Sequence, residues 1–92
     1  MSLIKETEEY LTKVVKDLGY DVEYINLVPN SRKELGQFQI NDAFSIAKSM
    51  HENPRVIAEK IVNALDKRFV NVNIAGPGFI NISLSEKYIV EV

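Results

Sequence analysis

The chain has 92 residues and a net charge of −2, with 46% hydrophobic and 26% charged residues, the balance of one small globular domain. It has no cysteine, which excludes disulfides and zinc–thiolate sites, and its single histidine excludes a histidine-rich metal site. No apolar run approaches the roughly 20 residues of a membrane-spanning helix, and the acidic start is unlike a signal peptide. We therefore expect a cytoplasmic domain with no metal and no membrane partner.

The first half of the chain predicts a helix, a strand and a loop. Residues 3–18 repeat apolar side chains at helical spacing, and Gly19 follows as a stop signal. Residues 21–28 alternate imperfectly and predict a strand, whereas residues 29–33 form a polar, locally basic loop. Residues 36–40 are short enough to be either a strand or an ordered loop.

Two helices are expected next, and they meet at Asn53. The first follows Asn41, and one of its faces carries Phe44, Ala47 and Met50 or His51. Asn53-Pro54 predicts the start of the second, because asparagine caps helices and proline suits their first position. This helix runs to about residue 66, and its inner stripe is Ile57, Ala58, Ile61, Ala64 and Leu65.

The last third predicts a hairpin of two strands joined at Gly76-Pro77-Gly78. Alternation assigns one set of side chains to the inner face of the sheet: Val70, Val72, Ile74, Ile80, Ile82 and Leu84. The outer face then carries Asn71, Asn73, Phe79, Asn81 and Ser83. The resulting fold class is α+β, a mostly antiparallel sheet with helices packed on one face, in the order αββααββ. We expect one domain over residues 1–85, with residues 86–92 starting a helix that leads to a further domain.

The sequence indicates no catalytic residues. His51 is typical of a helix C-terminus, where a cation is favourable, and the acidic pairs Glu8-Glu9 and Asp21/Glu23 are typical of solvated faces. The four glycines form no phosphate-binding motif, so no cofactor is expected in this chain.

The outer face of the hairpin is the better candidate site. Phe79 and Asn81 are two residues apart on one strand, so both point to the same side. An aromatic ring can stack on an unstacked base while an amide reads the edge of that base. The alternative is that Phe79 packs under a loop and the asparagines only face solvent.

Three segments resemble the N-terminal domain of arginyl-tRNA synthetases. Ala-Gly-Pro-Gly-Phe-Ile-Asn-Ile at residues 75–82 resembles the signature that closes this domain. Residues 35–41 are similar to the family's Phe-Gly-Asp-Tyr-Gln segment, with Leu35 and Gln37 in place of the usual Phe and Asp. Residues 53–58 are similar to the start of the family's next helix.

The resemblance implies a domain that binds the elbow of tRNA-Arg and contacts a base in the D-loop. The family's aromatic–amide contact pair falls on Phe79 and Asn81, and Gly76 stands where some relatives carry a contacting asparagine. Gln37, Phe38 and Gln39 are expected as supporting contacts. The residues expected near the phosphates of the tRNA are Arg32, Lys33, Lys48 and Arg55. No DNA partner is expected.

The family's His-x-Gly-His and Lys-Met-Ser-Lys signatures are absent, so ATP and arginine would be used by a catalytic domain in cis. Three interpretations remain. The chain is the tRNA-binding domain of an arginine–tRNA ligase, or it is a stand-alone protein-interaction or regulatory module with the same fold and no RNA binding. A small enzyme is the least favoured reading, because no nucleophile–base pair is present.

Overall fold

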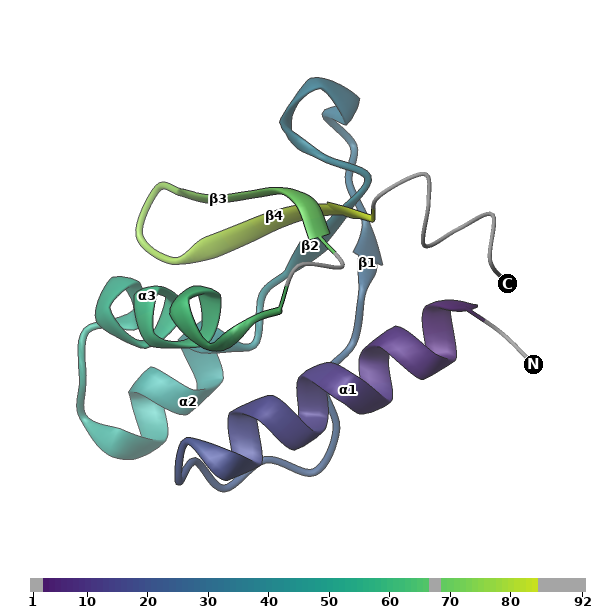
Figure 1. Ribbon diagram of the computed structural model, residues 1–92. Helices are drawn as coiled ribbons and strands as arrows, with labels where there is room; N and C mark the ends of the chain where they lie inside the picture. Colours follow the sequence, from purple (N-terminus) through teal and green to yellow (C-terminus); the bar gives the residue numbers. More distant parts are fainter. Residues whose placement is uncertain (1–2, 67–68, 85–92) are drawn as a thin grey trace.

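The computed structural model describes residues 3–66 and 69–84, without the side chains of Lys33 and Val70. Its elements are α1 (Leu3–Asp17), β1 (Val28–Pro29), the 3-10 helix η1 (Lys33–Leu35), β2 (Phe38–Ile40), α2 (Ala43–Met50), α3 (Pro54–Ala64), β3 (Phe69–Ala75) and β4 (Phe79–Leu84). The strands form an antiparallel sheet in the order β1-β2-β4-β3. All three α-helices lie on one side of this sheet (Figure 1), which confirms the α+β class. The helix expected over residues 86–92 lies outside the described residues.

The core lies between the sheet and the helices. Strand β4, central with β2, contributes Ile80, Ile82 and Leu84, and α3 contributes Ile57, Ala58 and Ile61, all of them buried. Leu11 and Val15 bury the inner stripe of α1 against the same cluster. Apolar burial of this kind is the main stabilising term of a small domain, and it holds the hairpin in place.

The hairpin turn rests on the start of α3, where the predicted cap forms. The Asn53 side chain accepts a hydrogen bond from the Arg55 backbone N–H at 2.9 Å. Arg55 in turn donates through Nη1 to the carbonyl oxygen of Gly76 at 2.7 Å. Gly76 has a φ of +57°, and a Cβ on Gly78 would lie 3.1 Å from Pro54 Cβ. Gly76 suits its left-handed backbone angle, and Gly78 allows the close approach of the turn to Pro54.

The strand predicted over residues 21–28 is wrong for most of its length, because only Val28 and Pro29 form β1. The backbone N–H of Ile25 donates to Thr12 Oγ1 at 2.9 Å, and that of Leu27 donates to Glu8 Oε2 at 2.8 Å. Side chains of α1 thus accept the hydrogen bonds that these backbone N–H groups would have donated to a neighbouring strand.

The predicted inner face of α2 is also partly wrong. The buried residues are Ala43, Ile46 and Ala47, whereas Met50 is 46% exposed. His51 ends the helix with a left-handed φ of 55° and is exposed, so the apolar stripe is shorter than expected. Helix α3 ends at Ala64, which is exposed instead of belonging to the inner stripe.

Candidate nucleic-acid interface

A row of amide side chains crosses three strands on the face opposite the helices. Gln39 on β2 and Asn73 on β3 both lie directly opposite Asn81 on β4. Gln39 Nε2 donates to Asn81 Oδ1 at 3.2 Å, and Asn81 Nδ2 donates to Asn73 Oδ1 at 3.1 Å. The register thus places three amides side by side and bonds them through the central one.

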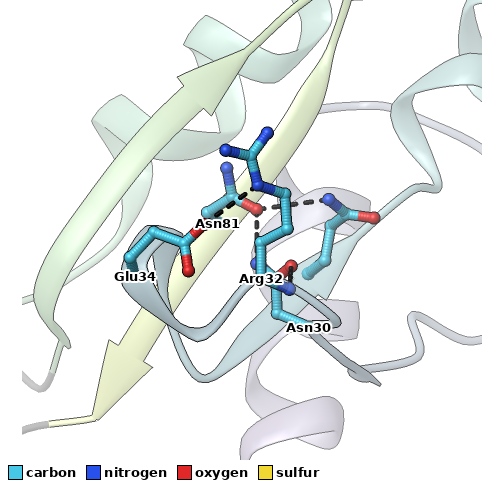
Figure 2. A network of polar contacts seen from close by, with 5 residues as sticks. Asn30, Arg32, Glu34 and Asn81 are labelled. Carbon is cyan, nitrogen blue, oxygen red and sulfur yellow. Dashed lines mark hydrogen bonds and ion pairs between the residues drawn. The ribbon is translucent and has the colours of Figure 1, made fainter.

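The segment between β1 and β2, residues 30–37, covers this row. Asn30 Nδ2 donates to Asn81 Oδ1 at 2.7 Å, and Asn73 Nδ2 donates to the carbonyl oxygen of Leu35 at 3.1 Å. A Cβ on Gly36 would lie 3.0 Å from the Ile82 carbonyl oxygen, so the segment approaches the backbone of β4 closely. Figure 1 shows the segment on the side of the sheet away from the helices, and Figure 2 shows the network that joins it to β4.

The expectation that Asn81 is displayed on an open sheet face is therefore wrong. Asn81 is 0% exposed, because residues 30–37 fold over it, and its Oδ1 accepts hydrogen bonds from both Asn30 and Gln39. Asn30, which is also buried, was not among the expected site residues. No feature of the sequence pairs it with Asn81, which is 51 residues away along the chain.

Phe79 lies beside the turn and is half-buried. Its ring packs edge-on against Phe44 of α2, with ring centroids 4.8 Å apart and planes inclined by 63°. This contact fixes one edge of the ring without enclosing the whole side chain. Gly76, three residues before Phe79 at the start of β4, is exposed.

The remaining members of the expected site separate into two groups. Gln37 is exposed and fixes the end of β4, because its backbone N–H donates to Ser83 Oγ at 3.0 Å and its Oε1 accepts from the Leu84 N–H at 3.1 Å. Phe38 pairs with Ile82 and packs against the core on the helix side of the sheet. Phe38 is therefore not on the face that carries Gln39, Asn73 and Asn81.

The basic residues near this site differ in whether another group of the protein already binds them. Arg32 Nε pairs with Glu34 Oε1 at 2.9 Å, and the pKa of Glu34 is lowered by its backbone hydrogen bond and by Arg32. Arg55 is exposed but bound to the turn, while Lys48 is exposed on α2. The side chain of Lys33 lies outside the description. Arg32 and Arg55 thus have structural partners before any ligand binds.

Neither a metal site nor a membrane span is found in the described parts of the chain. No three His, Asp or Glu side chains gather there in a group that could hold a metal ion. No helix between residues 3 and 66 is long and apolar enough to cross a membrane.

The fold and part of the sequence are shared with known proteins. The chain is 37% identical over 93 residues to an arginine–tRNA ligase of Francisella tularensis subsp. novicida (strain U112), covering 99% of this chain and 16% of that protein. It is 51% identical over 71 residues to one of Prochlorococcus marinus (strain NATL2A), covering 71% and 12%. The chain thus spans about one sixth or less of the curated relatives it matches.

Two solved structures share the fold. Arginyl-tRNA synthetase from Plasmodium falciparum superposes with a TM-score of 0.82 at 23% identity, covering 95% of this chain and 17% of that one. The Thermus thermophilus arginyl-tRNA synthetase gives a TM-score of 0.80 at 18% identity, covering 98% and 15%. The family model for the arginyl tRNA synthetase N terminal domain matches residues 2–84. The chain therefore belongs to the arginyl tRNA synthetase N-terminal domain family.

Proposed function

We propose that this chain is the tRNA-binding domain of an arginine–tRNA ligase and contacts a D-loop base at the elbow of tRNA-Arg. The observation that carries this proposal is the family match over residues 2–84, together with relatives that are named arginine–tRNA ligases. In such a protein a catalytic domain in cis uses ATP and arginine to form arginyl-tRNA. This domain adds orientation and selectivity for the tRNA.

The geometry beside the hairpin turn supports the proposal. Folded RNA is usually recognised through unstacked bases, which need a flat apolar surface and nearby amides. Phe79 supplies the ring, and the amide row that contains Gln39 and Asn81 begins two residues away on the same strand and its neighbour. Gly76 has no side chain, which leaves room for an RNA backbone at the turn. Gln37 supports the site by fixing the end of β4.

Phosphate contacts are a minor part of this function. The chain has a net charge of −2, and two of its arginines already bind Glu34 and the carbonyl oxygen of Gly76. Lys48, Arg55 and Arg32 would supply at most a few contacts, and Lys33 directly follows Arg32 in the sequence. Each contact would add about −0.7 to −0.9 to the slope of log affinity against log salt.

The test is a titration of this chain with a tRNA-Arg transcript, followed by NMR chemical shifts and by fluorescence anisotropy. We expect shifts at Phe79, Gly76 and Gln39. Phe79→Leu should weaken binding by about 5- to 150-fold, because base stacking on an aromatic ring contributes about 1–3 kcal/mol.

Phe38→Leu is the matched control, since this aromatic residue is also half-buried but lies on the helix side of the sheet. Circular dichroism of both variants shows whether each is folded. Equal effects of the two substitutions would contradict a contact at Phe79. Absence of any shift at high RNA concentration would instead favour a protein-interaction module without RNA binding.

A further inference from the structure

The two edges of the sheet differ in how well they are protected against pairing with another chain. Strand β1 forms one edge with only two residues, Val28 and Pro29, and the proline has no N–H to donate. Strand β3 forms the other edge with seven residues, none of them charged and none of them proline. Short strands, charges and prolines are the usual means by which proteins protect an edge. By these criteria β1 is a protected edge, whereas β3 is open to a further strand.

The regular part of β3 is residues 71–75. An irregularity in the register precedes this segment, and within it each residue lies opposite one residue of β4. Alternate residues of an edge strand direct their N–H and C=O groups away from the neighbouring strand, and no strand among the described residues lies beyond β3. Val72 and Ile74 are half-buried, whereas Ile82 and Ile80 opposite them are 0% exposed. A strand added to β3 would bond these backbone groups and cover the two half-buried side chains.

Asn73, at the centre of this segment, has unused hydrogen-bonding groups. Its Nδ2 donates to the carbonyl oxygen of Leu35 at 3.1 Å, and its Oδ1 accepts from Asn81 Nδ2 at 3.1 Å. An amide has two N–H groups and two lone pairs on its oxygen, so one N–H and one lone pair of Asn73 have no partner in the described part of the chain. The side chain is half-buried. The matching group is another amide, because it offers both an acceptor and a donor.

A second copy of the same strand matches this edge. Antiparallel pairing about a twofold axis at Asn73 places the Asn73 amides of the two copies opposite each other. It also places Val72 opposite Ile74 of the other copy, and Asn71 opposite Ala75. Apolar side chains thus meet apolar ones, amide meets amide, and the segment brings no like charges together. A twofold interface requires such self-complementarity, because both copies use the same surface.

We propose that β3 is an interaction surface for a second copy of this chain, with residues 71–75 of the two copies paired antiparallel about a twofold axis at Asn73. The sheets of the two copies then form one continuous sheet. The contact is small, since it involves only residues 71–75 of each copy, and small interfaces are typical of weak, transient association. The inference does not depend on tRNA binding.

The first experiment measures self-association of this chain by sedimentation velocity at concentrations up to about 1 mM, the range of weak complexes. In the proposed register, position 71 of one copy faces position 75 of the other. Asn71→Lys combined with Ala75→Lys should weaken the dimer by about 2- to 30-fold, because like charges then lie opposite each other at two places. Asn71→Lys combined with Ala75→Glu should associate at least as tightly as the original chain, because each lysine then faces a glutamate.

The matched control is Ser45→Lys combined with Ser49→Lys. It adds the same two positive charges at exposed positions of α2, which lies on the helix side of the sheet and not at its edge. This variant should associate as tightly as the original chain, so a general effect of net charge is separated from an effect at β3. Circular dichroism of every variant shows whether it is folded.

The second experiment makes use of the absence of cysteine from the sequence. Asn71→Cys combined with Ala75→Cys places two thiols opposite each other across the interface, where opposite Cα atoms are about 4.5–5.5 Å apart, a spacing that a disulfide spans. Within one copy the two positions are about 13 Å apart along the strand, too far to be bridged. Mild oxidation should therefore give a covalent dimer with the double variant and far less of it with either single variant.

Three results would overturn the inference. A chain that stays monomeric at about 1 mM has no such contact with a second copy. If the Lys/Lys and Lys/Glu variants associate equally, the two copies do not pair in this register. If the single cysteine variants form as much covalent dimer as the double variant, the disulfides come from random collisions and β3 is not the interface.

Discussion

The middle of β4 is buried on both faces, by opposite chemistry. Ile80 and Ile82 face the helices and are 0% exposed, and Asn81 between them faces residues 30–37 and is also 0% exposed. An isoleucine gains from contact with any apolar neighbour, because the hydrophobic effect has no direction. A buried asparagine is tolerated only where donors and acceptors are placed for it. Residues 30–37 must therefore be positioned accurately enough to place hydrogen-bonding groups against Asn81, whereas the helices on the other side need only supply apolar contact.

Truncating the apolar face should give the largest loss of stability. Ile82→Ala removes a fully buried side chain at the centre of the core and leaves a cavity. We expect the free energy of unfolding, measured by urea denaturation, to fall by about 2–5 kcal/mol. Val56→Ala on the exposed side of α3 is the control, and it should change stability by about 0.5 kcal/mol or less. If the two substitutions lowered the free energy of unfolding equally, the Ile82 side chain would not be part of the core.

Removing a buried side chain from the polar face should lower the free energy of unfolding by a smaller amount and through a different mechanism. Asn81→Ala leaves the donors of Asn30 and Gln39 and the acceptor of Asn73 without their partner. We expect a loss of about 1–3 kcal/mol in urea denaturation, because unsatisfied buried polar groups are costly. Asn71→Ala on the same face should lose far less, since Asn71 is exposed. A loss no larger than that of Asn71→Ala would show that residues 30–37 do not cover β4 in solution.

Carboxylates, in contrast to the neutral amides of β4, hold the segment beside α1. Glu8 accepts from the Tyr24 hydroxyl at 3.1 Å and from the Leu27 N–H, and Asp42 Oδ2 accepts from the Asn26 N–H at 3.3 Å. Burial raises the pKa of Asp42 above its ordinary value of 3.8, the Asn26 bond opposes this, and the charge of Glu8 adds to it. The stability of this region should therefore depend on pH, whereas that of the amide row should not.

Asp42→Asn isolates this pH dependence and should have the smallest effect. A raised pKa means that the folded chain prefers the protonated carboxyl, so the stability contributed by Asp42 is present below pH 3.8 and is lost as pH rises through its folded pKa. Asparagine keeps an oxygen for the Asn26 N–H and carries no charge. The variant should match the original chain near pH 3 and exceed it by about 0.5 kcal/mol at neutral pH.

Thermal unfolding of both proteins across this pH range is the measurement. A variant that is less stable at neutral pH would mean that the ionised carboxylate contributes more as an acceptor than its burial costs. The same scan on Asn81→Ala should show a pH-independent difference, because no member of the amide row titrates.

Local signals in the sequence were sufficient for the elements that form the core. The Asn53-Pro54 cap, the Gly76–Gly78 turn and the alternation of Ile80, Ile82 and Leu84 each act over a few residues, and the structure confirms all three. The site was predicted less well. Asn81 lies on the outer face as predicted, but Phe38 belongs to the helix side, and the Phe79 ring packs against Phe44 of α2.

Only the tertiary structure decided what covers the outer face and what the segment at residues 21–27 bonds to. Asn30 meets Asn81 across 51 residues, and the Leu27 N–H meets Glu8 across 19. Neither contact leaves a periodic pattern, because each consists of single polar atoms brought together by the packing of whole elements. The sequence by itself determined the α+β class, the apolar core and the hairpin, since these depend on short-range periodicity. Which amide side chains of the outer face are buried and hydrogen-bonded depends on long-range contacts, and these exist only after the chain has folded.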